Sequence, residues 1–263
     1  MGVNYSTARW LGPTSFVINF AAQQYGIFST PSMKDVNDRN QSFFSPHPYF
    51  IAAFFFPQQL FQLAWLYRLW KLNPKKSIEE KKELDEVVRF VPYYAVGNLC
   101  IAAWMVFWNA ERLDISDMMV VINTGTQLYY MTTQLGPMNT RSTSSVLTHV
   151  VSKTFAGIGV LDILHNTSVA FFKDQPATLA IKVLTGVGFG LGAAASDWIF
   201  GGCLVYDLAA FAVGQSGQWR TLLGAYAVGA AAIVGLKNWA RPPYTRDQVE
   251  YRPAPGEDVD AHV

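Results

Sequence analysis

The chain has 263 residues, of which 51% are hydrophobic and only 15% are charged. Soluble domains carry about 25% charged residues, so this composition argues against a soluble enzyme. It also excludes a disordered chain, a coiled coil and a disulfide-rich secreted module. The net charge of +1 gives no case for binding nucleic acid. Cys100 and Cys203 both lie in apolar runs, which indicates buried thiols rather than a disulfide or a metal pair.

Long apolar stretches alternate with short charged segments along the chain. About 20 apolar residues in a helix span the core of a bilayer. Eight stretches approach that length, at about 10–28, 47–70, 90–110, 116–135, 144–172, 176–195, 197–214 and 219–239. The seventh is short and the first contains polar residues, so seven spans stay open as an alternative. The sequence therefore predicts an all-α fold, a polytopic transmembrane helical bundle of about eight spans over residues 1–239.

Three segments define the expected organisation further. The run 176–214 is too long for one span, and its many glycines favour two closely packed helices joined by a very tight turn. The hydrophilic segment 71–89 is rich in Lys and Arg and is expected to be a basic cytoplasmic loop. The segment 240–263 is rich in Pro and charge, which is typical of a disordered tail.

The distribution of Lys and Arg predicts the orientation of the bundle, because these residues stay on the cytoplasmic side of a membrane. With eight spans and a cytoplasmic N-terminus, that side holds Arg9, the basic residues of 68–89, Arg141 and the basic residues of the tail. We therefore expect both termini in the cytosol, with the endoplasmic reticulum as the expected membrane. The sequon at 40–42 would then be lumenal, either as a glycosylation site or as a chance match.

Ionisable residues inside apolar stretches are the main functional candidates, because burying them in a membrane is costly. Asp162, His165 and Asn166 share one stripe of the fifth expected helix. Asp207 lies in the middle of the seventh, about ten residues from either end. It needs a partner on another helix or must keep its proton. Each acid is interpreted either as a proton donor or as a hydrogen-bonded packing group.

Two more acids have alternative interpretations. Asp197 stands at the tight turn before the seventh stretch, where a carboxylate often caps a helix. Glu111 falls near Trp104 and Trp108 on a helical wheel of the third stretch. This group is either part of a pocket for an apolar cation or a marker of the membrane interface with its aromatic belt.

Several chemistries lack their motifs. The sequence has no P-loop, no GxGxxG fingerprint, no HExxH and no GxSxG elbow. The histidines are not spaced for a di-iron or haem site, and no acidic cluster is suited to Mg²⁺ on a diphosphate. We therefore expect neither a cofactor nor a metal.

Two family resemblances follow from these residues. Residues 45–50 (SPHPYF), leading into an aromatic helix and then a helix with Asn98, Trp104 and Trp108, resemble translocator-protein-like (tryptophan-rich sensory) membrane proteins. The chain length, the number of apolar stretches and the isolated membrane acids resemble fungal integral-membrane terpene cyclases of ascochlorin- and macrophorin-type meroterpenoid pathways. The second resemblance implies a metal-independent enzyme that acts on a hydrophobic prenylated molecule in the bilayer.

The leading functional hypothesis is a membrane terpene cyclase of the isomerase or lyase class. A buried neutral acid would protonate an epoxide or alkene, and aromatic rings would stabilise the carbocation. The acid is expected to be Asp207 or Asp162, then Glu111, oriented by His165 or Asn166. The expected pocket residues are Trp104, Trp108, Tyr129, Tyr130, Trp198 and Asp197. The alternatives are a translocator-like protein that binds or transports a sterol, tetrapyrrole or other lipid, and a proton-coupled transporter.

Overall fold

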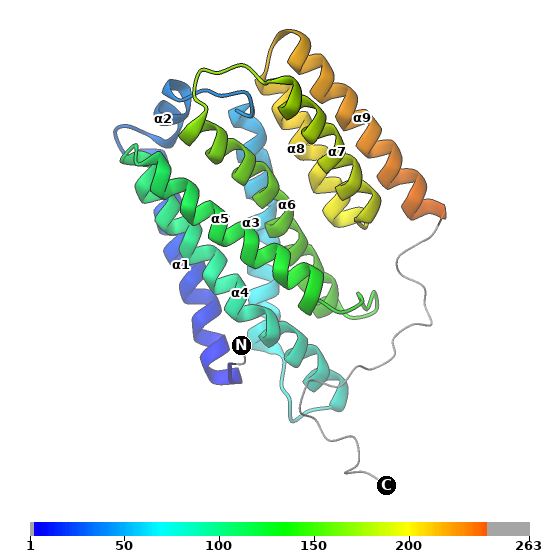
Figure 1. Ribbon diagram of the computed structural model, residues 1–263. Coiled ribbons are helices and arrows are strands. Elements are labelled where there is room, and N and C mark those ends of the chain that lie inside the picture. The colour runs from blue at the N-terminus through cyan, green and yellow to red at the C-terminus, as the bar shows by residue number, and fades with distance from the viewer. Residues whose placement is uncertain (1–2, 241–263) are drawn as a thin grey trace.

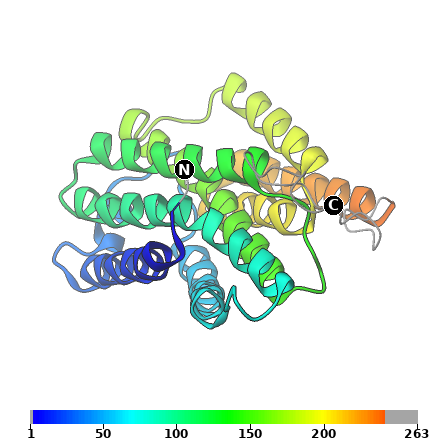
Figure 2. The same cartoon turned by 90° about the horizontal axis from the view of Figure 1, so that it is seen from below.

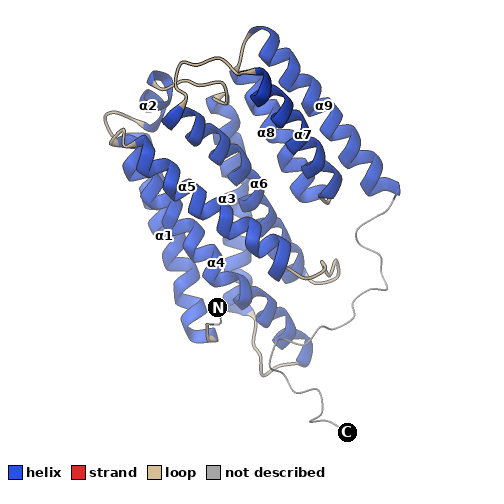
Figure 3. Ribbon diagram, viewed as in Figure 1, coloured by secondary structure: helices blue, strands red, loops and turns tan. Residues whose placement is uncertain are grey.

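The computed structural model describes residues 3–240, and in that part of the chain all regular structure is helical (Figure 3). The all-α prediction is therefore confirmed. The helices are α1 (Tyr5–Phe28), α2 (Met33–Arg39), α3 (Pro48–Lys71), α4 (Ile78–Asn109), α5 (Leu113–Tyr129), α6 (Thr143–Phe171), α7 (Leu179–Ala195), α8 (Trp198–Gly214) and α9 (Gly217–Ala240). A short π-helical segment, Tyr130–Gln134, ends α5.

Three helices among the described residues are long and apolar enough to cross a membrane, namely α4, α6 and α9. Helices α7 and α8 are equally apolar but shorter. The most apolar part of α6 is 61% buried and that of α9 only 28%. Helix α6 therefore lies in the interior of the bundle and α9 at its periphery (Figure 1).

Helix α6 connects two groups of helices. On one side it packs against α3, α4 and α5, while α1 covers α4. On the other side it packs against α8, which together with α7 and α9 forms a second group. The two groups are visible side by side when the bundle is viewed from below (Figure 2). The contact between α6 and α8 is thus the main junction of the fold.

The expected basic loop at 71–89 is largely helical, which corrects the sequence-based prediction. Only a short turn separates α3 from α4, because Ser77 caps α4 by accepting the N–H of Glu80 at 3.1 Å. Glu79 and Glu80 also complement the positive end of the helix dipole. Hydrophilic composition therefore marks an exposed extension of α4 rather than a loop. The expected tail lies outside the described residues after Ala240.

One end of the bundle, here called the basic end, gathers cationic side chains from distant segments. Arg9 of α1 donates to the carbonyls of Leu69 and Leu72 at 3.3 and 2.6 Å. Arg68 of α3 pairs with Glu83 of α4 at 3.0 Å and donates to Ser144 of α6 at 2.9 Å. The start of α1, the turn between α3 and α4, and the start of α6 therefore lie together.

The opposite end is closed by α2 and by residues 42–47, here called the strap. The capping box of α2 joins Ser32 to Asp35, and hydrogen bonds from the Ser32 backbone and hydroxyl hold the pKa of the Asp35 carboxyl below its usual value. The strap is held by α8 and α9. Gln215 donates to the carbonyls of Ser42 and Ser45 at 3.0 and 2.9 Å, and Trp219 donates to the carbonyl of Phe43 at 2.6 Å.

The sequon at 40–42 forms part of this closed end. Asn40 is only 4% exposed. Its oxygen accepts from Lys173 at 2.9 Å and its nitrogen donates to the carbonyl of Val36 at 2.9 Å. Ser42 is bonded to Ser168 of α6 at 2.6 Å. The folded chain has no room for a glycan on Asn40, which favours the interpretation of the sequon as a chance match.

Small residues allow the helices around α6 to approach closely. A Cβ atom added at Gly157 of α6 would lie 2.3 Å from the Cβ of Cys203 on α8. A Cβ added at Gly159 would lie 2.9 Å from the hydroxyl oxygen of Thr124 on α5. Both distances are shorter than van der Waals contact, so each position requires glycine for the observed packing.

We expect Gly157→Ala to destabilise the protein by about 1–3 kcal/mol, because the new methyl group must force α6 and α8 apart. The matched control is Gly188→Ala, since nothing lies within 4 Å of an added Cβ at that glycine on α7. The control should unfold at or above the wild-type temperature, because alanine favours helix. Thermal unfolding in detergent micelles measures both, and equal midpoints for the two variants would contradict the packing argument.

Candidate functional site

Asp207 is the most unusual side chain of the bundle. It lies in the middle of α8 and is 0% exposed. Both of its carboxyl oxygens lack a hydrogen-bond partner among the residues that the structure describes. Leu204, Leu208 and Phe211 on the same face of α8 belong to an apolar core that also contains Leu161 of α6. The carboxyl group is thus enclosed by hydrocarbon.

Asp162 lies at the same level on the neighbouring helix. Helices α6 and α8 run in the same direction, since Lys153 pairs with Asp197 and Gly157 contacts Cys203. Asp162 is partly buried and lies within electrostatic range of Asp207. Ionising both carboxyls would place two negative charges at one apolar helix junction, which is costly. We call Asp162 and Asp207 the carboxyl pair.

The side chains of His165 and Asn166 contact groups other than the Asp162 carboxyl. Asn166 accepts from the indole N–H of Trp104 at 2.7 Å and donates to the backbone carbonyl of Asp162 at 2.8 Å. The ring of His165 packs on Trp108, with the ring centroids 5.6 Å apart. Both residues therefore fasten α6 to α4, one turn from the carboxyl pair toward the strap end. Any orienting effect of these two residues on the Asp162 side chain would therefore act through the backbone of α6.

Trp104 and Trp108 form the aromatic group nearest to this part of α6. Their ring centroids are 5.6 Å apart, and Trp108 is 2% exposed. The Trp108 N–H donates to the carbonyl of Met33 at 3.2 Å, which ties the pair to α2. Both indoles are thus held in place by hydrogen bonds.

The other expected pocket residues are not brought together with the carboxyl pair. Tyr129 is 53% exposed, whereas Tyr130 is buried against Phe90 in a cluster nearer the basic end. Trp198 is 48% exposed at the start of α8. Glu111 lies at the exposed end of α4, where it pairs with Arg39 at 2.9 Å. The single pocket expected from the sequence is therefore distributed over separate parts of the bundle.

Asp197 caps α8, which confirms the capping interpretation of this residue. One carboxyl oxygen accepts the N–H groups of Ile199 and Phe200 at 3.1 and 3.0 Å, and the other pairs with Lys153 of α6. The pair is nearly buried, with side-chain exposures of 10% for Lys153 and 13% for Asp197. A carboxylate held by a cation and two backbone donors is a structural anchor rather than a proton donor.

Two further buried polar residues were not singled out as candidates from the sequence. Asp117 of α5 is 6% exposed and accepts from Thr167 of α6 at 2.9 Å. His149 of α6 is 2% exposed, and both ring nitrogens lack a hydrogen-bond partner among residues 3–240. The sequence feature that could have identified Asp117 is the position of an acid at the start of an apolar stretch. The burial of His149 results from helix packing, and no sequence pattern indicated it.

Two surface hollows are described, and neither borders the carboxyl pair. One lies between α8 and α9 at the basic end, and the other lies beside α2 and the strap. Within the described part of the chain, no three His, Cys, Asp or Glu residues are grouped so as to hold a metal ion. Comparisons with protein-family models, curated proteins and solved structures give no match. Functional inference therefore depends on the geometry of the carboxyl pair.

The anchoring role of Asp197 leads to a testable outcome. Lys153→Met removes the ammonium group that pairs with the nearly buried Asp197 carboxylate, and we expect a loss of stability of about 3–5 kcal/mol. The double variant Lys153→Met/Asp197→Asn should recover much of this loss, because asparagine still caps a helix and carries no charge. Thermal unfolding in detergent tests both. A double variant as unstable as the single one would contradict the anchor.

Proposed function

We propose that the chain is an integral-membrane protein in which α1 and α3–α9 all cross the bilayer, with the basic end in the cytosol of an endoplasmic reticulum membrane. Each of these helices overlaps one of the eight apolar stretches of the sequence, and α4 extends beyond its stretch at the N-terminal end. The basic end gathers Arg9 of α1, Arg68 of α3 and Lys81 of α4, as expected for a cytoplasmic face. Large apolar side chains are also exposed on α7 and α9, where lipid would cover them.

Within that membrane, we propose acid-initiated cyclisation of an isoprenoid chain. The observation that supports this function is Asp207, a fully buried carboxyl group without any hydrogen-bond partner among the described residues. An unpaired carboxylate in such surroundings is costly, so the neutral carboxylic acid is the stable form there. A neutral acid next to a second carboxyl group supplies a proton donor and a proton acceptor at one place.

The proposed reaction takes up one proton and releases one proton. The Asp207 carboxyl protonates the epoxide oxygen or the terminal alkene carbon of the substrate, and the resulting cation is attacked by the next double bond to form a ring. Loss of a proton from carbon to Asp162 or back to Asp207 ends the reaction and leaves a new double bond. The product is an isomer of the substrate, and no cofactor is consumed.

Nearby aromatic rings are suited to stabilise the cation. Phe211 lies one turn after Asp207 and packs on Phe44 of the strap, with ring centroids 5.2 Å apart. Tyr206 packs on Phe54 of α3 at 5.5 Å, and its hydroxyl donates to the carbonyl of Phe50 at 2.6 Å. Trp104 and Trp108 contact Asn166 and His165, one turn after Asp162 on α6. Because the rings are held by packing and hydrogen bonds, their faces are preorganised.

Asp207→Asn should reduce turnover by about 10²–10⁴-fold, because the amide keeps the shape of the side chain but cannot donate the proton. Asp162→Asn should reduce it less, and Glu111→Gln should leave it unchanged, because Glu111 is exposed and paired with Arg39. The assay incubates membranes with an epoxyfarnesyl phenol and measures a cyclised product of identical mass.

The level and thermal unfolding of each variant in the membrane serve as controls for folding. Wild-type turnover by Asp207→Asn would refute the acid assignment. Tight retention of the prenylated compound by the wild type without any isomer formed would instead support the alternative, a lipid-binding or transport protein.

A further inference from the structure

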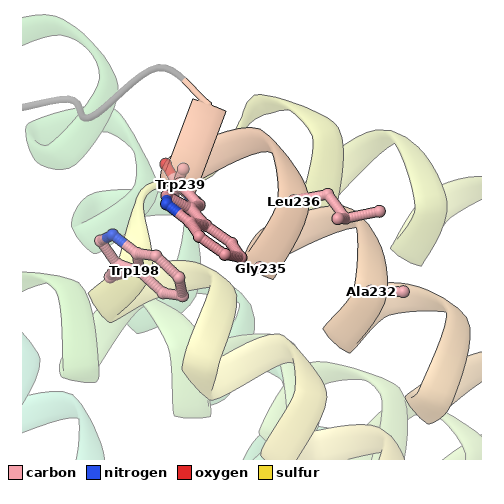
Figure 4. A pocket seen from close by; sticks show the side chains of 6 residues that line it. Trp198, Ala232, Gly235, Leu236 and Trp239 are labelled. Atoms are coloured by element: carbon pink, nitrogen blue, oxygen red, sulfur yellow. The ribbon is translucent and has the colours of Figure 1, made fainter.

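The hollow between α8 and α9 lies away from the carboxyl pair and has no part in the proposed chemistry. It has a volume of about 680 Å³ and is lined by Trp198, Ala232, Gly235, Leu236, Asn238 and Trp239. The rings of Trp198 and Trp239 lie across from each other on its rim, while Leu236 and Ala232 continue it along α9 (Figure 4). Apart from Asn238, the lining is apolar or aromatic, which is suited to a hydrocarbon chain.

In the membrane placement proposed above, the hollow lies where the bilayer meets water at the basic end. It adjoins the turn at Ser196 and Asp197, and Asp197 is tied to Lys153 near the start of α6. Trp198 and Trp239 are 48% and 80% exposed. Tryptophan favours the interface of a bilayer, where the indole ring lies near the headgroups.

A cation lies directly beside this apolar lining. Lys237 of α9 donates to the carbonyl of Ser196, and the buried amide of Asn238 donates to the same carbonyl at 3.3 Å. An ammonium group has three N–H donors, so the lysine has further donors for a ligand. Among the residues that the structure describes, this turn has the paired Lys153 and Asp197 and, beside the hollow, the ammonium group of Lys237. Lys237 thus adds a positive charge next to the apolar lining.

We propose that this hollow binds one anionic phospholipid, with an acyl chain between Trp198 and Trp239 and the phosphate group against Lys237. Basic pockets between helices at the cytoplasmic side of a membrane select anionic headgroups. The apolar lining accounts for the acyl chain, and the ammonium group of Lys237 accounts for the charge preference. The inference depends on the membrane placement proposed above but not on the cyclisation chemistry.

The test uses phospholipids with brominated acyl chains, which quench tryptophan fluorescence on contact. The full chain is reconstituted in nanodiscs with increasing fractions of brominated phosphatidylglycerol or brominated phosphatidylcholine. Trp10 and Trp70 are also exposed and pack on each other at 5.6 Å, so both are changed to Phe in the background. Half-maximal quenching should need about fivefold less of the anionic lipid.

Variants show which residues cause the headgroup preference of the quenching. Trp198→Phe/Trp239→Phe should remove the part of the quenching that depends on the headgroup. Lys237→Gln should remove the preference, Lys237→Arg should keep it, and Lys182→Gln on α7 should leave it unchanged. Equal quenching by both lipids, or a preference that survives Lys237→Gln, would overturn the proposal. The cyclisation assay tests the carboxyl pair, so its outcome does not depend on the result of this quenching experiment.

Discussion

The close approach of α6 and α8 is the constraint on which the rest of the structure depends. Because Gly157 has no side chain, Cys203 reaches the backbone of α6 and the two helices pack in parallel along their length. This packing brings Lys153 to Asp197 at one level and Asp162 to Asp207 at another. The same packing thus places one acid beside a cation and the other among apolar side chains.

The sequence predicted the helices well because hydropathy reports directly on burial and on lipid exposure. It failed at 71–89, where hydrophilic composition was taken for a loop, although Ser77 and its two following acids begin a helix. Within the site, Asp207 was found because an acid in mid-helix is unusual in any apolar stretch. The Lys153–Asp197 pair was not found, because it depends on the register between two helices that sequence periodicity does not contain. Tyr129 and Tyr130 show the same limit, since adjacent residues of one helix end face opposite environments.

The two acids of α8 show how environment divides one chemical group into two roles. Asp197 is a carboxylate with a cation and two backbone N–H donors, so it stabilises a turn. Asp207, three turns later on the same helix, has no such donors among the described residues and is enclosed by Leu204, Leu208 and Phe211. The difference arises from the neighbours and not from the residue type.

The helix group α7–α9 is fastened at both of its ends. Lys153 and Lys237 hold the turn before α8 at the basic end, and Gln215 and Trp219 hold the strap at the other. Rotating α7–α9 as a rigid body about either end would break the hydrogen bonds at the other end. Any opening between α8 and α6 that keeps both sets of bonds must therefore lie between the two ends, at the depth of the carboxyl pair.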